Sequence, residues 1–322
     1  MLRVLNCVKS NNSVEVKVDR TILIGGGSGL IGSRLTQLLT QKGYQVRHLG
    51  REPKDGAVKT FGWDIHGQTL DEHAFEGVTA VINLAGANIS GHRWTEAYKK
   101  ELAASRTGST KLLVDFLDNK PNNVKNFISG SAIGYYGFGS DKTWFRETDP
   151  PGNDFLAQLV ASWEHEASKL KNERVKLAFV RTGIAFAREG GALEEMARPV
   201  RLFAGAPLGS GKQIVSWVHI DDLCGIFIHI LENDLSGPFN GAAPDPASNE
   251  RITQAIAKIL HKPLWLPNIP AFVLKVVLGE MFESVINGSK ISCDKIKATG
   301  FEYQFPMLES ALNDTLNPQK NF

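Results

Sequence analysis

Four hydroxyl side chains lie close together in the stretch ISGSAIGYYG, residues 128–137, at the end of an apolar run. They belong to Ser129, Ser131, Tyr135 and Tyr136. Serine and tyrosine hydroxyls can exchange protons with a substrate, but an unperturbed tyrosine has a pKa of about 10 and needs help to ionise near neutral pH. The stretch is either an active site or a polar turn, and residues elsewhere in the chain must decide.

A glycine-rich loop upstream has the spacing of a dinucleotide-binding site. The stretch TILIGGGSGLIGSRL places three glycines three residues apart, between an apolar strand and a helix. The first permits a tight turn, the second lets a pyrophosphate approach the backbone, and the third lets helix and strand pack closely. The phosphates then lie at the positive helix end; the alternative is a tight turn without a ligand. The cofactor-binding residues expected in this loop are Gly26, Ser28, Gly29, Leu30, Ile31 and Gly32.

The residue after the second expected strand indicates which dinucleotide is bound. An NAD site usually carries Asp or Glu there, which binds the ribose 2′-hydroxyl. In VRHLGREPK, Gly50 and Arg51 stand at the strand tip instead of a carboxylate. Because a guanidinium suits a 2′-phosphate, the sequence predicts NADP(H) rather than NAD(H). The alternative for Arg51 is a solvated surface arginine.

Strands and helices must alternate to position these residues. Short apolar runs are separated by longer segments with apolar residues at helical spacing, which is typical of a parallel sheet covered on both faces. The sequence therefore predicts an α/β fold with a Rossmann-type doubly wound parallel sheet. The expected elements are strands at 21–24, 44–49, 78–86, 124–130 and 175–183, and helices at 30–43, 95–119 and 153–170.

The regular alternation ends near residue 186, where glycine and proline become frequent. We expect a smaller C-terminal substrate lobe over the carboxyl ends of the strands, with 250–312 mostly helical and GPFNGAAPDPASN, residues 237–249, as a loop. The predicted divisions are an N-terminal extension at 1–19 with a strand-like SVEVKV stretch, a nucleotide-binding domain at 20–245 that includes the start of the lobe, and a helical domain at 246–322.

Motifs along the first two thirds of the chain fit one known pattern. GGSGLIG, NLAG, SRTGSTKLL and VRTGIAF occur in that order, and together they resemble the extended, NAD-dependent epimerase/dehydratase-like form of the short-chain dehydrogenase/reductase superfamily. SGSAIGYYG, PLGSGKQIVSWVHIDDL and GPFNGAAP narrow the resemblance to its epimerase family subgroup, which has a small helical C-terminal domain; some members are called cell-division-inhibitor-like. The resemblance implies further cofactor-binding residues, namely Leu84, Ala85, Gly86, Ser105 and Thr182.

The usual catalytic pair of that superfamily is absent from this sequence. The pair is Tyr-x-x-x-Lys, in which the lysine lowers the tyrosine pKa and holds the nicotinamide ribose. No lysine stands four residues after any of the five tyrosines. The helix where the pair would fall is apolar at those positions, which carry Phe155, Leu156, Leu159, Val160 and Trp163.

Three hydroxyl residues remain as catalytic candidates. Ser131 occupies the position of the superfamily's active-site serine, which orients the substrate oxygen, and Tyr135 and Tyr136 follow it. The resemblance therefore places all three beside the nicotinamide. The alternatives are a pocket-lining role for Ser131 and simple ring packing for the tyrosines.

His219, Asp221 and Asp222 in WVHIDD suggest a His–carboxylate pair or half of a metal site. No second cluster has ligand spacing, and the resemblance implies that this segment joins the two lobes. We therefore expect no metal.

Two arginines near the expected cleft have open roles. Arg93, with Trp94, can bind an anionic substrate group or help to cap the long helix, where Thr95 suits the N-cap position. Arg106 faces either the nucleotide or solvent.

Composition limits the partners. The formal charge of +2 over 322 residues argues against an extended nucleic-acid surface. No apolar run approaches the roughly 18 residues of a membrane span, so no membrane partner is expected. Three separated cysteines form neither a disulfide framework nor a zinc signature, and no secretory signal is evident, which favours a reducing, cytoplasmic location.

Two functions fit these observations. The first is an atypical NADP(H)-dependent oxidoreductase or nucleotide-sugar epimerase, which acts on an unknown small molecule without the Tyr-Lys pair. The alternative is a catalytically silent, NADP(H)-sensing regulatory protein. A homodimer is compatible with both.

Overall fold

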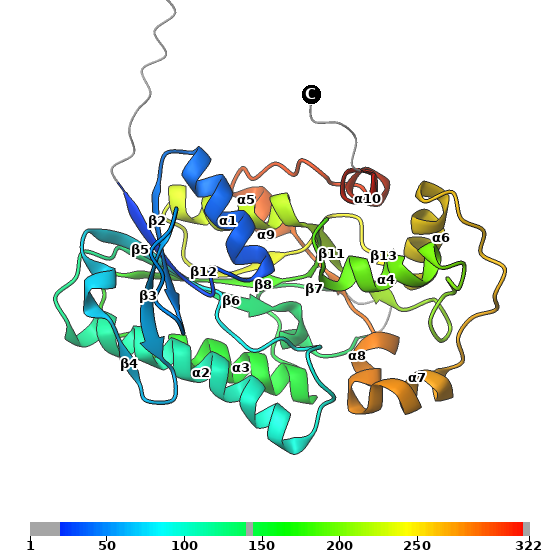
Figure 1. Ribbon diagram of the computed structural model, residues 1–322, viewed down its shortest axis with the longest axis horizontal. Helices are drawn as coiled ribbons and strands as arrows, with labels where there is room; N and C mark the ends of the chain where they lie inside the picture. Colours follow the sequence, from blue (N-terminus) through cyan, green and yellow to red (C-terminus); the bar gives the residue numbers. More distant parts are fainter. Residues whose placement is uncertain (1–19, 140–143, 318–322) are drawn as a thin grey trace, which may run out of the picture.

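The computed structural model describes residues 20–139 and 144–317. The expected extension at 1–19, with its strand-like stretch, lies outside these residues. Within them, an eight-stranded sheet runs through the molecule (Figure 1). All neighbouring strands are parallel except β3 and β4. In spatial order the strands are β12 (Gly237–Gly241), β8 (Lys176–Thr182), β6 (Asn126–Ala132), β5 (Val78–Asn83), β1 (Thr21–Gly25), β2 (Gln45–Gly50), β3 (Lys59–Asp64) and β4 (Thr69–Leu70).

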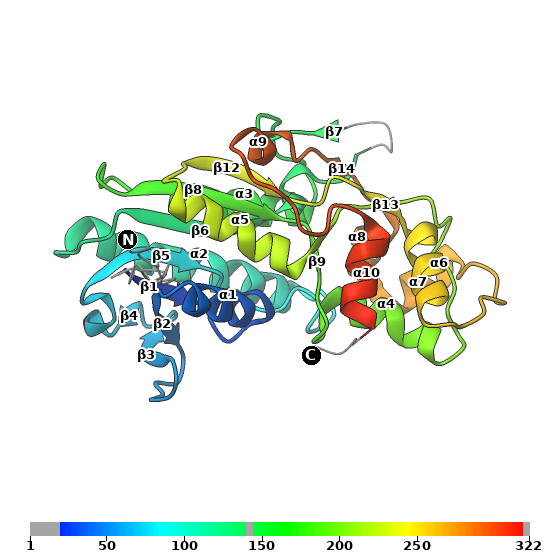
Figure 2. The same ribbon diagram turned by 90° about the horizontal axis from the view of Figure 1, so that it is seen from above.

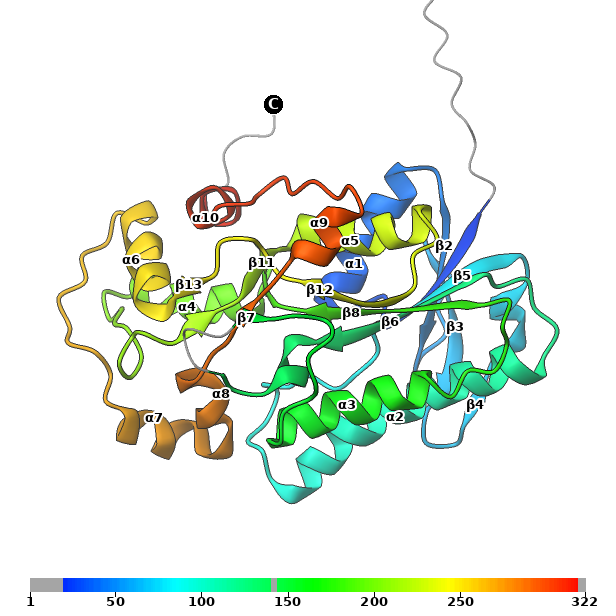
Figure 3. The same ribbon diagram turned by 180° about the vertical axis from the view of Figure 1, so that it is seen from behind.

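Helices cover both faces of the sheet, which confirms the predicted fold class. One face carries α1 (Leu30–Gln41) and α5 (Ile220–Glu232), and the other carries α2 (Glu96–Asn119) and α3 (Phe155–Ala167), as Figures 1 and 3 show. Side chains alternate along β1 between the two faces of the sheet. Ile22 and Ile24 join the core with α1 and α5, and Leu23 joins the core with α2. In the described ranges, no helix has the length and apolarity needed to cross a membrane.

The strand order creates one place where ligands can collect. From β1 the chain moves outward to β2 on one side, and it later returns to place β5 on the other side. In open α/β sheets the crevice outside the carboxyl ends at such a reversal is the usual ligand site. The glycine loop follows β1, Leu84–Gly86 follow β5, and Ser131 lies near the end of β6.

A second lobe gathers at these carboxyl ends (Figure 2). Its core joins Trp217 to Ile252, Ile256 and Leu312, so residues on both sides of position 245 share one core. The lobe contains α4 (Gly191–Arg201), α6 (Asn249–Ile259), α7 (Ala271–Leu278), α8 (Phe282–Ile286) and α10 (Leu308–Leu316). Short strand pairs connect it: β9 (Ile184–Phe186) with β11 (Trp217–His219), β10 (Ile214–Val215) with β13 (Ala247–Ser248), and β7 (Trp144–Phe145) with β14 (Lys290–Ile291). The 3-10 turns are η1 (Glu72–Phe75), η2 (Ile133–Tyr136) and η3 (Gly279–Met281).

The prediction of a loop at 237–249 is wrong at both ends. Its first five residues form the edge strand β12, and its last three form β13 and the start of α6. Pro238 is tolerated in β12 because an edge strand has one side without a neighbour. Beside it, α9 (Asp294–Ala298) returns from the second lobe to pack against β12, and Ile296 joins the core of α1 and α5.

Candidate cofactor and active site

The three glycines of the loop meet three different geometric needs. Gly26 has φ +77°, and a Cβ atom there would lie 2.8 Å from the backbone of Leu84 and Ala85. A Cβ at Gly32 would lie 2.3 Å from the carbonyl oxygen of Gly26. Gly29 differs: its backbone is extended, with φ −75° and ψ 172°, and in the described structure a Cβ would meet nothing nearer than that carbonyl, at 3.4 Å. The fold therefore requires Gly26 and Gly32, whereas Gly29 leaves space at the start of α1.

The space at Gly29 suits an anion. The first turn of α1 contains no acidic residue, and the first backbone N–H groups of a helix have no partner within it. These groups and the helix dipole favour negative charge. Leu30 and Ile31 supply part of this first turn, and their side chains pack against the core of α1 and α5.

His48, which the sequence did not single out, supports the loop from below. A Cβ at Gly27 would lie only 2.3 Å from the His48 ring. The His48 Nε2 atom lies 2.8 Å from the Thr36 hydroxyl oxygen. Burial lowers the pKa of His48. The ring is thus a neutral support near physiological pH, and only glycine fits above it.

Arg51 directly follows β2 and is exposed. Within residues 20–139 and 144–317, its side chain makes no ion pair or hydrogen bond. Its guanidinium therefore remains available at the position predicted for the 2′-phosphate.

Arg106 lies against the other wall of the crevice. A Cβ at Gly86 would lie 3.1 Å from its side chain, so Arg106 faces this turn from α2. The guanidinium donates to the carbonyl oxygens of Leu102 and Ala87 at 3.0 and 3.1 Å, but no carboxylate of the described structure pairs with it. Burial lowers the pKa of Arg106. Its neighbour Ser105 accepts a hydrogen bond from the Ala87 N–H at 3.0 Å and thereby positions the same turn.

Ser131 is buried in a charged network that the sequence did not reveal. Its hydroxyl donates to Glu164 Oε1 at 2.5 Å. The same carboxylate binds Arg181 through two hydrogen bonds of 2.8 Å, from Nε and Nη2. Only 2% of Ser131, 8% of Glu164 and 3% of Arg181 is exposed. Burial alone would lower the pKa of Arg181, but the hydrogen bonds and charge of Glu164 outweigh it, and the net shift is upward. Thr182 closes the network with a 2.9 Å hydrogen bond to the Ser131 carbonyl oxygen.

The two tyrosines differ in how their hydroxyls are used. Tyr136 is buried; its hydroxyl donates to Asn240 Oδ1 at 2.6 Å and accepts from Arg181 Nη1 at 2.9 Å. Burial raises the pKa of Tyr136 to about 12, although Arg181 opposes the shift. Tyr135 is half-buried, and its ring lies 3.5 Å from the Arg181 guanidinium carbon. No residue of the described ranges hydrogen-bonds the Tyr135 hydroxyl.

The His–carboxylate group in WVHIDD joins the two lobes. The His219 ring packs on Phe305 at 3.9 Å between centroids and accepts from the Asp221 N–H. Asp222 accepts from the backbone N–H groups of Gln304 and Phe305, at 2.7 and 2.9 Å. In the part of the chain that the structure describes, no three His, Cys, Asp or Glu side chains converge as metal ligands would.

Arg93 also holds the lobes together, whereas the hydrogen bond of Trp94 is local. Arg93 donates to the Val276 carbonyl oxygen of α7 at 2.8 Å. Trp94 is buried and donates to the Ile89 carbonyl oxygen at 2.8 Å. Thr95 is the N-cap of α2, as predicted, and accepts from the Tyr98 N–H.

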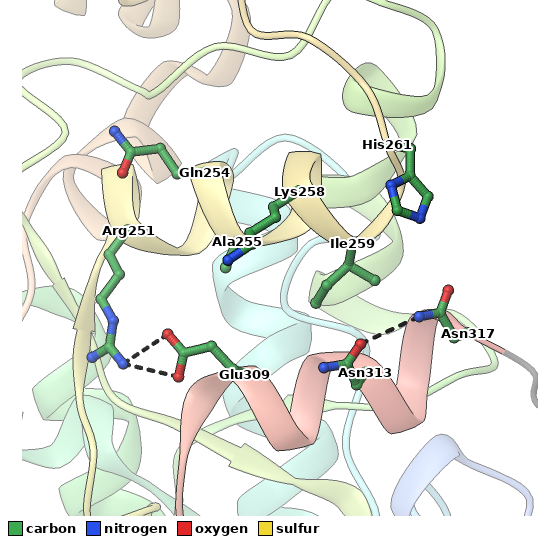
Figure 4. A pocket seen from close by; sticks show the side chains of 9 residues that line it. All are labelled: Arg251, Gln254, Ala255, Lys258, Ile259, His261, Glu309, Asn313 and Asn317. Carbon is green, nitrogen blue, oxygen red and sulfur yellow. Dashed lines mark hydrogen bonds and ion pairs between the residues drawn. The ribbon is translucent and has the colours of Figure 1, made fainter.

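A surface hollow of about 460 Å³ lies between α6 and α10 (Figure 4). The guanidinium of Arg251, which lines the hollow, already pairs with Asp245 and Glu309. The hollow contains none of the residues described above and is a separate feature of the second lobe. Its lining consists of Arg251, Gln254, Ala255, Lys258, Ile259, His261, Glu309, Asn313 and Asn317.

Replacement of Glu164 by glutamine should test the buried network. The amide keeps the shape but leaves the Arg181 charge uncompensated, so the free energy of unfolding in urea should fall by about 3–5 kcal/mol. Asp115→Asn, in the exposed pair with Lys111, is the matched control and should cost less than about 1 kcal/mol. Equal losses in both variants would show that the buried pair has no special weight.

Comparison with known proteins agrees with this geometry. Residues 22–243 match the NAD dependent epimerase/dehydratase family, and residues 269–315 match a domain of unknown function. The chain is 38% identical over 309 residues to the Arabidopsis thaliana "Epimerase family protein SDR39U1 homolog, chloroplastic", covering 93% of this chain and 88% of the relative. It is 36% identical over 300 residues to the Mus musculus epimerase family protein SDR39U1, covering 92% and 99%.

A solved structure is similar over nearly the same length. The human epimerase family protein SDR39U1, crystallised with NADPH, superposes with a TM-score of 0.84 at 35% sequence identity, covering 92% of this chain and 99% of that chain. The similarity thus covers the sheet, the glycine loop and most of the second lobe. The chain belongs to the NAD dependent epimerase/dehydratase family of short-chain dehydrogenase/reductase-like proteins.

Proposed function

We propose that this protein binds NADP(H) and carries out an oxidoreductase or epimerase-type reaction on a small molecule. The open space at Gly29, at a helix start without acidic residues, is the observation that carries the proposal. The exposed Arg51 favours a cofactor with a 2′-phosphate, and NADPH is the molecule in the human relative's structure.

The residues around the crevice divide the work of holding the cofactor. The N–H groups that open α1 would bind the pyrophosphate, with Gly29 giving it room. Arg51 would pair with the 2′-phosphate. Leu84, Ala85 and Gly86 form the facing wall, and the half-buried charge of Arg106 behind Gly86 adds positive potential. When bound, the nicotinamide supplies or accepts a hydride.

Within this proposal, Tyr135 is the hydroxyl that meets the substrate. Ser131 and Tyr136 use their hydroxyls inside the network of Glu164 and Arg181, so they position the end of β6 and the turn after it. The Tyr135 ring lies on the Arg181 guanidinium, which fixes its place, and its hydroxyl remains able to donate or accept a proton.

A second candidate function rests on that same network. Ser131 and Tyr136 are bound to a buried ion pair, and the sequence lacks Tyr-x-x-x-Lys. Both features also suit a protein that senses NADP(H) without turnover. Tight NADPH binding without hydride transfer or epimerisation, across a panel of carbonyl compounds, alcohols and sugar nucleotides, would favour this alternative.

The first test is Gly29→Val. The branched side chain would occupy the space for the pyrophosphate, so NADPH binding measured by fluorescence titration should be abolished. The extended backbone at this position accepts valine, so the melting temperature should stay near that of the unchanged protein. Gly32→Val is the contrast, because its side chain meets backbone and should lower the melting temperature. Unaltered affinity in Gly29→Val would refute the site.

The second test concerns the choice of cofactor. Loss of a charge-assisted contact of about 1.5–3 kcal/mol in Arg51→Ala should weaken NADPH binding roughly 10- to 150-fold and leave NADH binding unchanged. Lys54→Ala removes another exposed cation three residues further on and is the control, with little effect expected. If the unchanged protein binds both cofactors equally, or Arg51→Ala keeps the preference, this assignment fails.

The third test separates the hydroxyls. Once a substrate is found, Tyr135→Phe should lower turnover by about 10²–10⁴-fold with little change in stability. Tyr136→Phe should instead lower the free energy of unfolding by about 1 kcal/mol, because it removes buried hydrogen bonds. Ser131→Ala should leave NADPH affinity nearly unchanged. Full turnover in all three variants would show that the stretch is only structural.

A further inference from the structure

Helix α7 exposes an apolar face at one end of the molecule. Phe272, Val273, Val276 and Val277 follow the spacing of a single helix face, and Leu274 alone is buried. Phe272, Val276 and Val277 are 71%, 74% and 65% exposed. Single exposed apolar residues are normal on a protein surface, but a contiguous apolar face marks an interaction site.

Further exposed apolar side chains lie on the loops at this end of the lobe. Trp265 is 68% exposed, and its indole N–H donates to the Phe203 carbonyl oxygen at 3.0 Å. Leu202 and Phe203 are themselves exposed. Figures 1, 2 and 3 agree in placing α7 and the segment between α6 and α7 at the same end of the second lobe. We call this surface the lobe tip; it comprises Leu202, Phe203, Trp265, Phe272, Val273, Val276 and Val277.

Most charges around the lobe tip are positive. The segments 196–209 and 255–279 contain five Lys or Arg residues and no Asp or Glu, although the whole chain is nearly neutral and Glu194, Glu195 and Glu280 directly flank the segments. Of the five, Arg201 pairs with Glu194, while the others form no ion pair with any residue that the structure describes. Lys262 lies 4.0 Å from the Phe203 ring centroid, so positive charge and apolar surface are interleaved. The five are Arg198, Arg201, Lys258, Lys262 and Lys275, of which Lys258 also lines the hollow between α6 and α10.

We propose that the lobe tip binds the surface of an anionic lipid bilayer. Aliphatic and phenylalanine side chains can enter the boundary between headgroups and acyl chains, where tryptophan is also favoured. The surrounding cations then face anionic headgroups. This peripheral contact needs no spanning helix, and it departs from the expectation, drawn from the absence of long apolar runs, that no membrane partner exists.

The same charges argue against a second copy of the chain as the occupant. A two-fold interface brings one patch against itself, which would oppose each mostly basic cluster with an identical one. Lys275 lies between Leu274 and Val276 within α7, so two such helices packed together would bring like charges close. A lipid surface offers the opposite sign over a broad area.

Co-sedimentation of the full chain with vesicles tests the proposal. Binding should be at least about tenfold stronger to phosphatidylcholine–phosphatidylserine vesicles than to phosphatidylcholine alone, and added salt should weaken it. Val276→Asp should remove most binding, and Lys275→Glu should reduce the preference for anionic vesicles. Met307→Asp changes an exposed apolar residue outside the lobe tip and should bind as the unchanged protein does.

Unchanged melting temperatures would show that the variants are folded, since all three positions are exposed. Equal binding to both vesicle types, or full binding by Val276→Asp, would overturn the proposal. A dimer in light scattering that Val276→Asp dissociates, without vesicle binding by the unchanged protein, would instead assign the lobe tip to a second copy.

Discussion

The buried pair of Glu164 and Arg181 is the interaction on which the catalytic side of the crevice depends. A guanidinium with 3% exposure has lost nearly all its water, so it is tolerable only because a carboxylate meets it with two hydrogen bonds. The pair fixes α3 against β8, and its spare hydrogen-bonding capacity is used by Ser131 and Tyr136. Ser131 and Tyr136, two of the catalytic candidates from the sequence, are thus held in a rigid support.

The cofactor side is built on a different principle. There the loop has no room for side chains, because a Cβ atom at Gly26 or Gly32 would lie within 3 Å of neighbouring backbone. Support comes from the neutral His48 ring below and from the turn after β5 beside it. A site made largely of backbone groups keeps its shape under most side-chain changes, whereas the network around Ser131 depends on every partner. The cofactor half of the crevice is therefore sensitive to substitution mainly at its glycines, and the other half at each partner of the network.

Much of the fold follows from the sequence because strand and helix periods are local. The glycine spacing, the Thr95 cap and the central parallel strands are all visible in short windows. Edge elements are not: β12 contains Gly237 and Pro238, and β3 buries only Phe61 and Trp63 on one side, so neither resembles a continuous apolar strand. The Glu164–Arg181 pair could not be predicted for another reason. The two residues are 17 positions apart, on α3 and β8, and they meet only when that helix packs against the sheet.

The two edge strands of the sheet are built in ways that hinder association with other chains. Unpaired strand edges are templates for association with other chains. At one end β4 is only two residues long and runs against β3. At the other, Pro238 removes a donor from β12, and α9 packs beside the strand. Both borders are blunted, so crowded or partly unfolded molecules of this protein have few places at which to add strand to strand and begin to aggregate.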